Sequence, residues 1–443
     1  MTDRYQDFAS TSLGRMLVKS LGLPDPVRLD RYVAGSPLVD GIVVVGGTGR
    51  LADQVPAILD RLGVTRTDAP EEGARYRGLV FDATGLRDPG SLVALRDFFG
   101  PLMRSLDRCA RLVVVGTPPE RLQGAERVAQ RALEGFTRSL GKEVGRGGTA
   151  QLVYVAEGAE GAVGSTVGFL LSPKSAYVSG QVIRVGARVL QPAEEPDWRR
   201  PLVGKVALVT GAARGIGEQI SRVLARDGAT VVGVDVPQAA SDLIGLARQL
   251  DGDYLTLDIT AKDAPKRIAQ HLTASHGGVD VVVHNAGITR DRRLANLDPE
   301  RWRSVLDVNL VAPERITDEL LAQQVVHANG RIVGVASIAG IAGNLGQTSY
   351  ATSKAGVIGL VDALRDTLDR DITVNAVAPG FIETAMTAAM PFGPREVGRR
   401  LNSLSQGGLP VDVAETVAWF ADPASTAVTG NVVRVCGQML LGA

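Results

Sequence analysis

Residues 205–217 read Lys205-Val-Ala-Leu-Val-Thr-Gly-Ala-Ala-Arg-Gly-Ile-Gly217. The stretch opens with a short apolar run, which predicts a buried strand, and closes with glycines spaced G-x-x-x-G-x-G, which predict a tight turn. A helical pattern begins near Glu218. A strand, a glycine turn and a helix in this order predict the first unit of a doubly wound α/β fold with a parallel sheet.

The glycine loop is suited to phosphate, because glycines let a pyrophosphate approach the backbone N–H groups at a helix N-terminus. A loop of this kind alone is weak evidence, since a purely structural turn also uses glycine. The next apolar run, Val231-Val-Gly-Val-Asp235, strengthens it by ending in an acidic residue that can accept hydrogen bonds from adenosine ribose hydroxyls. The predicted dinucleotide contacts are Gly211, Arg214, Gly215, Ile216, Gly217 and Asp235.

Asp235 also bears on the choice of nicotinamide cofactor. A carboxylate at this position would repel the 2′-phosphate of NADPH, so we expect NADH to be preferred. Arg214 in the loop could help to hold that phosphate, which keeps NADPH as the alternative.

Further predicted cofactor contacts follow the ends of later strands, where ligands bind in open α/β sheets. Asp258 and Ile259 are expected at the adenine edge, and the Asn-Ala-Gly turn beside the dinucleotide. Four residues from Pro379 to Thr384 are expected around the nicotinamide. For Asp258 and for the Asn-Ala-Gly turn, the alternative is a purely structural role. These residues are Asp258, Ile259, Asn285, Ala286, Gly287, Pro379, Gly380, Ile382 and Thr384.

A serine, a tyrosine and a lysine in residues 337–354 are spaced for catalysis. Ser337 ends an apolar run, and Tyr350 and Lys354 are four residues apart, which places them on one face of a helix. Reduction of a ketone by hydride requires a proton for the developing alkoxide, and a phenol with a pKa near ~10 releases it slowly at neutral pH. We expect the Lys354 ammonium to lower that pKa and Ser337 to stabilise the charge on the carbonyl oxygen. Tyr350 and Lys354 are also predicted to contact the cofactor.

Asn309 is predicted to lie within a helix. One interpretation is that it holds a water that feeds a proton relay through Lys354, and the other is that its buried amide stabilises a kink. Tyr-x-x-x-Lys alone is common in helices, but Ser337 and the glycine loop at fitting distances favour a catalytic role for the set Ser337, Tyr350, Lys354 and Asn309.

The composition of the chain limits the classes of function that it can have. The 443 residues predict two to three domains, and 48 basic against 48 acidic residues leave no net charge to recruit nucleic acid or an anionic membrane. The sequence shows no N-terminal signal pattern and no apolar run near ~18 residues, so we expect a cytoplasmic protein. Neither a disulfide framework nor a metal site is predicted from the scattered Cys109, Cys436, His271, His276, His284 and His327.

The first half of the chain repeats the strand and turn pattern from Gly41 onward in a weaker form. Aligned by eye, the two copies give offsets that grow along the chain. The pairs are Arg50 with Arg214 at 164, Thr117 with Ser337 at 220, Gly135 with Gly359 at 224, and Pro173 and Gly180 with Pro423 and Gly430 at 250.

The growing offset predicts where the first copy is shorter. The rise from 164 to 220 is large enough for a strand and a helix that the first copy lacks, and the rise from 224 to 250 marks a second, smaller loss. In the second copy the latter region includes residues 385–408, which we interpret as a mobile apolar lid suited to an acyl substrate.

The first copy also lacks the residue types that catalysis and dinucleotide binding require. Tyr350 and Lys354 correspond to Glu126 and Gln130, which cannot replace a phenol and an ammonium. The loop glycines at 215 and 217 correspond to leucine and aspartate, which would crowd and repel a pyrophosphate. We therefore expect the first copy to bind no dinucleotide and to catalyse nothing.

The domain boundaries follow from the same comparison. A segment with two prolines, three acidic residues and no periodicity separates the copies, which is typical of a linker. We expect residues 1–195 to form a degenerate, flavodoxin-like domain without cofactor or catalysis, residues 196–203 a linker, and residues 204–443 the NAD-binding domain.

Together, the spaced motifs resemble the short-chain dehydrogenase/reductase family. The segments that begin at Asn285, Ser337 and Ala378 look like those of the 3-oxoacyl-acyl-carrier-protein reductases, and the degenerate first half makes the chain similar to the high-molecular-weight ketoacyl reductases of actinobacteria. His284 departs from the family, which usually has Asn there.

This resemblance implies NADH-dependent reduction of 3-oxoacyl thioesters, carried by acyl carrier protein or CoA, in fatty acid biosynthesis. It also implies a homodimer that imitates the family's tetramer. The alternatives are another short-chain alcohol, steroid or hydroxyacyl-CoA dehydrogenase, and a scaffold that binds NADH without turnover. Two arginine clusters could meet carrier phosphates or simply be solvated: Arg290, Arg292 and Arg293, and Arg395, Arg399 and Arg400.

Overall fold

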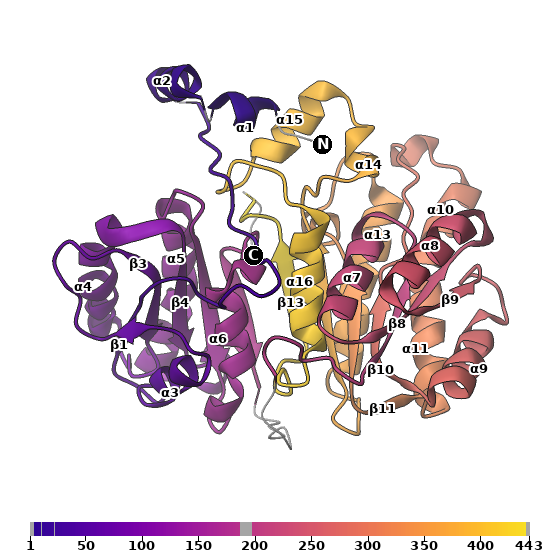
Figure 1. Cartoon of the computed structure of the whole chain (residues 1–443), viewed down its shortest axis with the longest axis horizontal. Coiled ribbons are helices and arrows are strands. Elements are labelled where there is room, and N and C mark those ends of the chain that lie inside the picture. The colour runs from indigo at the N-terminus through magenta and orange to yellow at the C-terminus, as the bar shows by residue number, and fades with distance from the viewer. Residues whose placement is uncertain (1–3, 10, 22, 187–196, 440–443) are drawn as a thin grey trace. The chain divides into compact units, whose positions relative to one another are not determined.

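The computed structural model describes residues 4–9, 11–21, 23–186 and 197–439, and it contains two parallel sheets (Figure 1). The predicted linker begins at residue 196, which lies outside these ranges. The contacts divide the chain into two compact units. The first contains the N-terminal half with Phe381–Gly408 and the segment from Val435, and the second contains the remainder up to Gly380 with Leu409–Arg434. Among the described residues, no helix is both long and apolar enough to cross a bilayer.

The sheet of the second unit has seven strands in the order β9-β8-β7-β10-β11-β12-β13. This is the order of a doubly wound dinucleotide-binding fold, in which the chain starts at a central strand and builds outward in both directions. The strands are β7 (Val206–Thr210), β8 (Thr230–Asp235), β9 (Asp253–Thr256), β10 (Val279–His284), β11 (Val326–Val335), β12 (Thr373–Pro379) and β13 (Val432–Val435).

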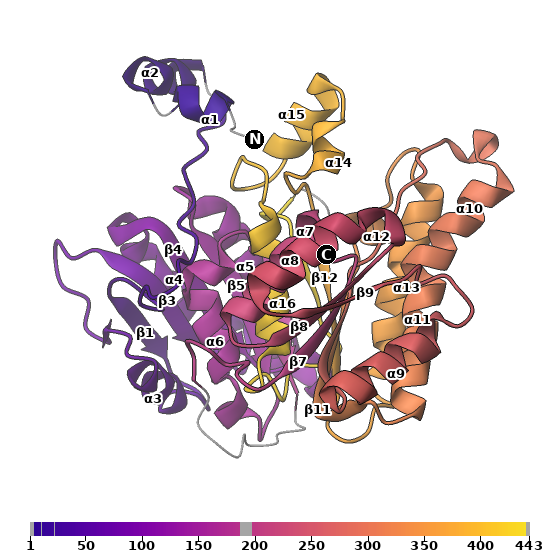
Figure 2. The ribbon, with the colours of Figure 1, turned by 45° about the vertical axis from the view of Figure 1, so that its right-hand side comes forward.

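The helices of this unit cover the sheet. Helices α9 and α11 pack side by side (Figure 2), and α7 packs against both α8 and α16. The helices are α7 (Gly215–Arg226), α8 (Ala240–Leu250), α9 (Ala264–His276), α10 (Pro299–Leu306), α11 (Ala312–Ala322), α12 (Ile338–Ala342), α13 (Thr348–Leu364) and α16 (Pro410–Ala421).

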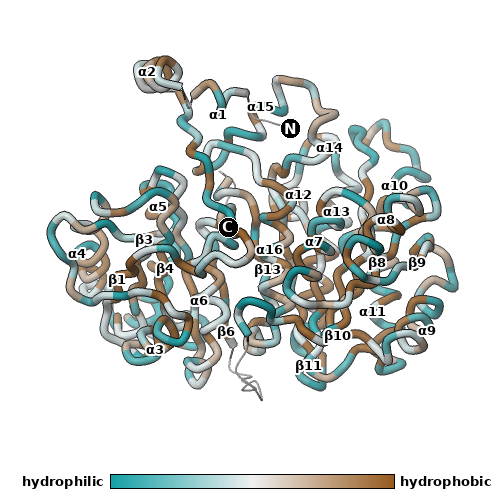
Figure 3. The backbone as a smooth tube through the Cα atoms, viewed as in Figure 1, coloured by the Kyte–Doolittle hydropathy of each residue, from teal (hydrophilic) through white to brown (hydrophobic). Residues whose placement is uncertain are grey.

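The central strands are apolar almost throughout, because a parallel sheet covered by helices is buried on both faces. Figure 3 shows hydrophobic strands inside more hydrophilic helices. Leu208, Val232, Val282, Ile332 and Val374 belong to one buried cluster of the second unit.

The first unit has a six-stranded sheet in the order β2-β1-β3-β4-β5-β6. This order is flavodoxin-like, as the sequence predicts. The strands are β1 (Val43–Gly47), β2 (Arg66–Thr67), β3 (Tyr76–Asp82), β4 (Leu106–Gly116), β5 (Thr149–Val155) and β6 (Gln181–Val185). The helices of the first half are α1 (Arg4–Ala9), α2 (Ser12–Leu21), α3 (Gln54–Arg61), α4 (Val93–Leu102), α5 (Gly124–Glu143) and α6 (Gly164–Leu171).

The two sheets correspond strand for strand except at one edge. With β1 matched to β7 and β3 to β10, the first sheet has no counterpart of β9 among the described residues. The shorter spacing in the sequence predicts this loss. The connection from β5 to β6 carries α6 as its α-helix, whereas the connection from β12 to β13 carries α14 (Ala385–Ala388), α15 (Phe392–Arg400) and α16.

Two buried arginines also correspond. Arg111 on β4 donates from Nε to the carbonyl oxygen of Ser172, and Arg331 on β11 donates from Nε to that of Asp422, both at 3.4 Å. The arginines are 220 positions apart and the acceptors 250, the offsets that the surrounding segments show in the sequence. The two halves therefore repeat one architecture down to individual hydrogen bonds.

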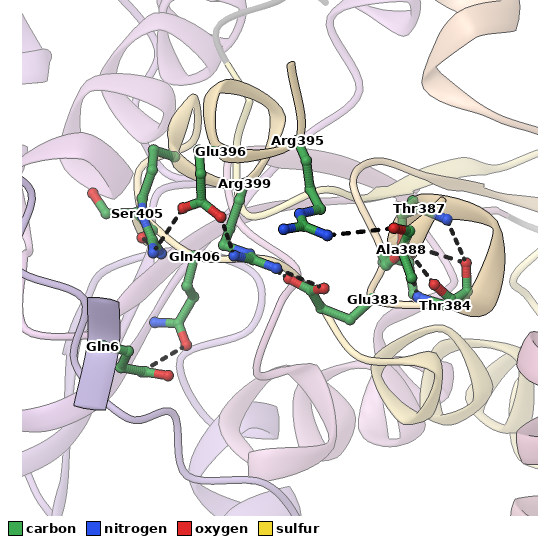
Figure 4. Close-up of polar contacts among 12 residues, drawn as sticks. Gln6, Glu383, Thr384, Thr387, Ala388, Arg395, Glu396, Arg399, Ser405 and Gln406 are labelled. Atoms are coloured by element: carbon green, nitrogen blue, oxygen red, sulfur yellow. Dashed lines mark hydrogen bonds and ion pairs between the residues drawn. The ribbon is translucent and has the colours of Figure 1, made fainter. Parts of the chain in front are cut away.

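Residues 381–408 belong to the first unit by their contacts, although the sequence-based boundaries place them within residues 204–443. The Tyr177 hydroxyl donates to the carbonyl oxygen of Gln406 at 2.7 Å, and Gln406 Nε2 donates to the carbonyl oxygen of Val27 at 2.7 Å. Gln6 also donates to the Gln406 side chain (Figure 4). The first half of the chain thus supplies partners for this segment.

Within the segment, Arg399 lies between two carboxylates (Figure 4). Its Nη2 is 3.0 Å from Glu383 Oε2, and its Nη1 is paired with Glu396. Because Arg399 is buried and ion-paired, it is not available to a carrier phosphate, which corrects one of the sequence-based possibilities for this arginine cluster. By contrast, Met386 and Phe392 of the same segment are exposed.

Candidate active site

The glycine loop between β7 and α7 has the conformation that its glycines predict. Gly211 and Gly215 have φ of +67° and +64°, in the left-handed region that favours glycine. At Gly217 a Cβ atom would lie 2.0 Å from the carbonyl oxygen of Gly211, so only glycine fits. Helix α7 begins at Gly215, and the N–H groups of a first helical turn have no partner within the helix, which suits a phosphate.

Asn285, after β10, holds this loop from the side. Its Nδ2 donates to the carbonyl oxygens of Thr210 and Gly211, each at 3.0 Å. The backbone N–H groups of Asn285 and Ala286 both donate to Thr210 Oγ1 at 3.1 Å. The side chain of Asn285 is thus fixed to the loop backbone, which supports a structural role for the Asn-Ala-Gly turn.

Asp235 ends β8 next to the same loop. Its Oδ2 accepts from the Ala213 N–H at 2.9 Å, and its Oδ1 accepts from the Val236 N–H at 2.9 Å. Backbone groups at the loop therefore orient the carboxylate. The neighbouring Arg214 is exposed.

Asp258 and Ile259 follow β9 and lie in different environments, one at the surface and the other in the core. Asp258 is exposed, and its Oδ1 accepts from the N–H and the hydroxyl of Thr260 at 2.9 and 2.8 Å. Ile259 is 6% exposed and lies in the apolar core. Any contact from Ile259 to a cofactor would therefore come from its backbone.

Ser337 and Tyr350 meet as the spacing predicts. Ser337 stands just beyond β11 as the N-cap of α12, where its Oγ accepts from the Ala339 N–H at 3.1 Å. Tyr350 lies near the start of α13, close enough to Ser337 for that side chain to lower its pKa. The strand end and the helix thus bring two of the three predicted catalytic groups close together.

Lys354 lies one turn further along α13 and is buried. Its Nζ donates to the carbonyl oxygen of Val335 at 2.6 Å and lies 5.7 Å from the centre of the Tyr350 ring. A Cβ atom on Gly287 would be 3.4 Å from both Lys354 Nζ and Asn309 Oδ1. The lysine, the asparagine and the Asn-Ala-Gly turn therefore surround one small volume.

The pKa values differ from the expected pattern. Burial raises the pKa of Tyr350 above its usual value, the hydrogen bond to Ser337 lowers it, and the Asp291 carboxylate raises it. Burial also lowers the pKa of Lys354 to about 8. The expected lowering of the phenol pKa by Lys354 does not prevail in this geometry, because burial disfavours the charged form of each group.

Asn309 lies in a π-helical turn, Asp307–Val311, between α10 and α11. Its Oδ1 accepts from the Ile288 N–H at 2.8 Å, and its Nδ2 donates to the Ile288 carbonyl oxygen and to Ser353 Oγ, each at 3.0 Å. The residue is 1% exposed. These contacts tie the irregular turn to α13 and to the loop after β10, as expected of a buried amide that stabilises a kink.

Two residues near this site were not predicted from the sequence. Asp291 acts on the tyrosine electrostatically, and its Oδ2 accepts from Gln347 Nε2 at 2.9 Å. Ser353 links Asn309 to the catalytic helix. The place of Ser353 beside Lys354 was a usable signal, whereas Asp291 lies in a loop whose path only the fold defines.

The residues after β12 are divided between the units. Pro379 ends the strand and Gly380 follows it, whereas Ile382 and Thr384 belong to the first unit. Thr384 is the N-cap of α14, and its Oγ1 accepts from the Thr387 N–H at 3.4 Å (Figure 4). Contacts from Ile382 and Thr384 to a nicotinamide remain predictions.

Residues 205–392 match the short chain dehydrogenase family. The 3-oxoacyl-[acyl-carrier-protein] reductase of Thermotoga maritima is 41% identical over 244 residues, which span 54% of this chain and 99% of that protein. The chain belongs to the short-chain dehydrogenase family.

Other short-chain dehydrogenase relatives align over a similar length. The 3-oxoacyl-[acyl-carrier-protein] reductase of Vibrio cholerae is 38% identical over 241 residues, covering 54% of this chain and 99% of that protein. Nodulation protein G of Rhizobium sp. strain N33 is 40% identical over 244 residues, which cover 54% of this chain and 98% of that protein. Each of these relatives therefore corresponds to about half of this chain.

In the first unit, Gln130 stands at the position that corresponds to Lys354 of the short-chain dehydrogenase site. Gln130 Oε1 accepts from the Thr117 N–H at 2.8 Å, and Nε2 donates to the carbonyl oxygens of Ala83 and Leu86 at 2.8 and 2.9 Å. An amide that joins three backbone groups from two loops in this way serves packing.

Arg50 lies against Thr117, the counterpart of Ser337. Its Nη2 donates to Thr117 Oγ1 at 3.2 Å and to the carbonyl oxygen of Val155 at 2.7 Å, and its Nη1 is paired with Glu160. The polar groups at this position therefore satisfy one another.

Proposed function

We propose that the second half of this chain reduces 3-oxoacyl thioesters, on acyl carrier protein or CoA, to 3-hydroxyacyl thioesters. The observation that carries the proposal is the convergence of Ser337 and Tyr350 beside the buried Lys354, whose Nζ lies 5.7 Å from the centre of the Tyr350 ring. Support comes from relatives, 37–41% identical, that are named 3-oxoacyl-[acyl-carrier-protein] reductases.

The residues divide the reaction between them. A bound reduced nicotinamide would supply the hydride to C3 of the substrate. The Ser337 hydroxyl holds the carbonyl oxygen and stabilises the charge that develops there. The Tyr350 hydroxyl donates its proton to that oxygen, which gives the 3-hydroxyl group. Lys354, when protonated, favours the phenolate that is left behind.

Replacing Tyr350 by Phe tests this assignment. The variant keeps the ring and loses only the proton donor, so we expect kcat for acetoacetyl-CoA or a longer 3-oxoacyl-CoA to fall by roughly 10²–10⁴. NADH oxidation followed by absorbance measures the rate. NADH binding followed by fluorescence is the control and should change little. If the variant kept more than a tenth of the wild-type rate, Tyr350 would not be the donor.

We also propose that NADH is preferred over NADPH, because the Asp235 carboxylate is held at the end of β8 beside the glycine loop. The expected result is a higher kcat/KM with NADH, and Asp235→Ser should reduce the difference between the cofactors. A kcat/KM tenfold better with NADPH in the wild type would contradict the proposal, and the exposed Arg214 would then be the residue to replace.

The first unit is proposed to bind no cofactor, since Gln130 and Arg50 occupy the corresponding position with internal contacts. Titration of the full chain should then give one NADH per chain rather than two. We further propose a homodimer that imitates the family's tetramer. Light scattering should give the mass of two chains, and a mass of one or four would rule this arrangement out.

A further inference from the structure

Two histidines of one helix and an aspartate of the preceding strand meet at one end of β9. Asp253 is the first residue of β9, and His271 and His276 lie on α9. Nε2 of His271 is 2.7 Å from Asp253 Oδ2, and Nε2 of His276 is 2.9 Å from the same oxygen. One ligand atom from each residue lies within 4.8 Å of the other two.

We propose that these three residues form a binding site for a divalent transition-metal ion, with Zn²⁺ as the ion it takes. Imidazole nitrogen and carboxylate oxygen are ligands that Zn²⁺ accepts at about 2.0–2.2 Å. Two nitrogens and one oxygen leave the fourth tetrahedral position to water. The sequence analysis predicts no metal site, because the residues come together only where the end of α9 meets the amino end of β9.

The cluster needs only small movements to hold an ion. Two ligand atoms on a tetrahedral Zn²⁺ lie roughly 3.3 Å apart, as bonds of about 2.0–2.1 Å require. The two nitrogen-to-oxygen distances are slightly shorter than this, and the two nitrogens are at most 4.8 Å apart. An ion would therefore need only a modest rearrangement of these three side chains.

The surroundings favour a cation. The Tyr254 N–H donates to Asp253 Oδ1 at 2.7 Å and holds the carboxylate in place, which leaves Oδ2 for the histidines or the ion. His276 is the last residue of α9, where the partial negative charge of the helix C-terminus attracts positive charge. The side chains of His271, His276 and Asp253 are 24%, 15% and 32% exposed, so an ion can enter from solvent.

The site lies apart from the proposed chemistry. Asp253 is at the amino end of β9, whereas Asp258 follows the carboxyl end, where the cofactor is expected. The ion would therefore join α9 to β9 and act on stability, and turnover should not depend on it.

Zn²⁺ binding by the full chain tests the proposal. Tag-free protein is freed of metal with EDTA, dialysed, and titrated with ZnCl₂ in competition with a chromophoric chelator; CoCl₂ then gives the visible absorption that reports ligand geometry. We expect one Zn²⁺ per chain, a higher Tm with Zn²⁺, and unchanged NADH binding. His271→Asn and Asp253→Asn should each weaken Zn²⁺ binding about tenfold or more.

His327→Asn is the matched control. His327 also faces an aspartate, with Nδ1 3.2 Å from Asp280 Oδ1, but without a second histidine, so this variant should bind Zn²⁺ like the wild type. Circular dichroism establishes that each variant is folded. If one of the two cluster variants does not fold, the other still tests the proposal. The proposal would be overturned if the wild-type protein did not bind one Zn²⁺ per chain, or if the folded cluster variants bound Zn²⁺ as tightly as the control. The three residues would then form a hydrogen-bonded contact only.

Discussion

At Asn309, three hydrogen bonds support the structural one of the two interpretations that the sequence allows. Both ends of its amide are engaged, by the backbone of Ile288 and by the Ser353 hydroxyl. These bonds use both N–H groups of the amide and one of the two acceptor positions of Oδ1, so a role in holding a relay water stays a prediction. A π-helical turn at this position still departs from the regular α-helical hydrogen-bond pattern, as such turns often do at functional sites.

His284 is a buried residue whose titration makes the stability of the protein depend on pH. It is 5% exposed, with Nε2 2.8 Å from Thr317 Oγ1, and burial lowers its pKa to about 4. The unfolded chain, with a histidine pKa near ~6.5, binds this proton at a higher pH than the folded chain. The contribution of His284 to stability is therefore lost as pH falls from about 6.5 towards 4, by about 2 kcal/mol between pH 7 and 5.

Urea unfolding of the wild type and of His284→Asn at pH 7 and pH 5 measures this effect. The free energy of unfolding of the variant should fall less between the two pH values, whatever its stability at pH 7. His327→Asn, at a half-exposed position, serves as the control and should keep the wild-type dependence. An equal fall in all three proteins would show that His284 is not the acid-sensitive group.

Among the elements, the loop between β7 and α7 depends most on close backbone contact. A Cβ atom on Gly217 would lie 2.0 Å from the Gly211 carbonyl oxygen and 2.4 Å from Asn285 Nδ2. The loop must therefore shift if this residue gains a side chain, and the N–H groups that face a phosphate shift with it.

Gly217→Ala should weaken NADH binding at least about tenfold and destabilise the protein by about 1–3 kcal/mol, since overpacking forces backbone movement. Fluorescence titration and urea unfolding measure the two effects. Gly245→Ala within α8 is the control, because its Cβ atom meets nothing within 4 Å, and it should stabilise the protein by about 0.5–1 kcal/mol. Normal NADH affinity in Gly217→Ala would contradict a phosphate-binding role for the loop.

Over the whole molecule, the two halves show one fold used in two ways. The Gln181 N–H donates to Gln151 Oε1 at 3.1 Å, and the Asn431 N–H donates to Asn375 Oδ1 at 3.0 Å, at offsets that match the sequence alignment. Packing contacts of this kind persist in the first half, whereas its catalytic positions carry glutamate and glutamine. The first half also forms one compact unit with residues 381–408.

Tyr177→Phe tests whether those contacts hold the segment. The fully buried Tyr177 hydroxyl donates to the Gln406 carbonyl oxygen, and its loss should cost about 1–3 kcal/mol and expose residues 381–408 to protease more often. Limited proteolysis followed by mass spectrometry locates the cuts. Tyr76→Phe, which removes a hydroxyl that contacts the Glu71 backbone instead, should leave cleavage of this segment unchanged. Equal cleavage in wild type and Tyr177→Phe would mean that other contacts hold the segment.

Local patterns in the sequence were enough to predict the doubly wound fold, its repetition, and the placement of Ser337 at a strand end with Tyr350 and Lys354 on one helix face. Apolar runs, glycine spacing and helical periodicity act between near neighbours in the chain, so they can be read without the fold. Properties that depend on distant neighbours became visible only in three dimensions. Burial set the pKa values of the tyrosine and the lysine, three partners fixed the amide of Asn309, and residues 381–408 joined the first unit. The cluster of two histidines and an aspartate at the amino end of β9 belongs with these, since its side chains meet only where the end of α9 comes next to that strand.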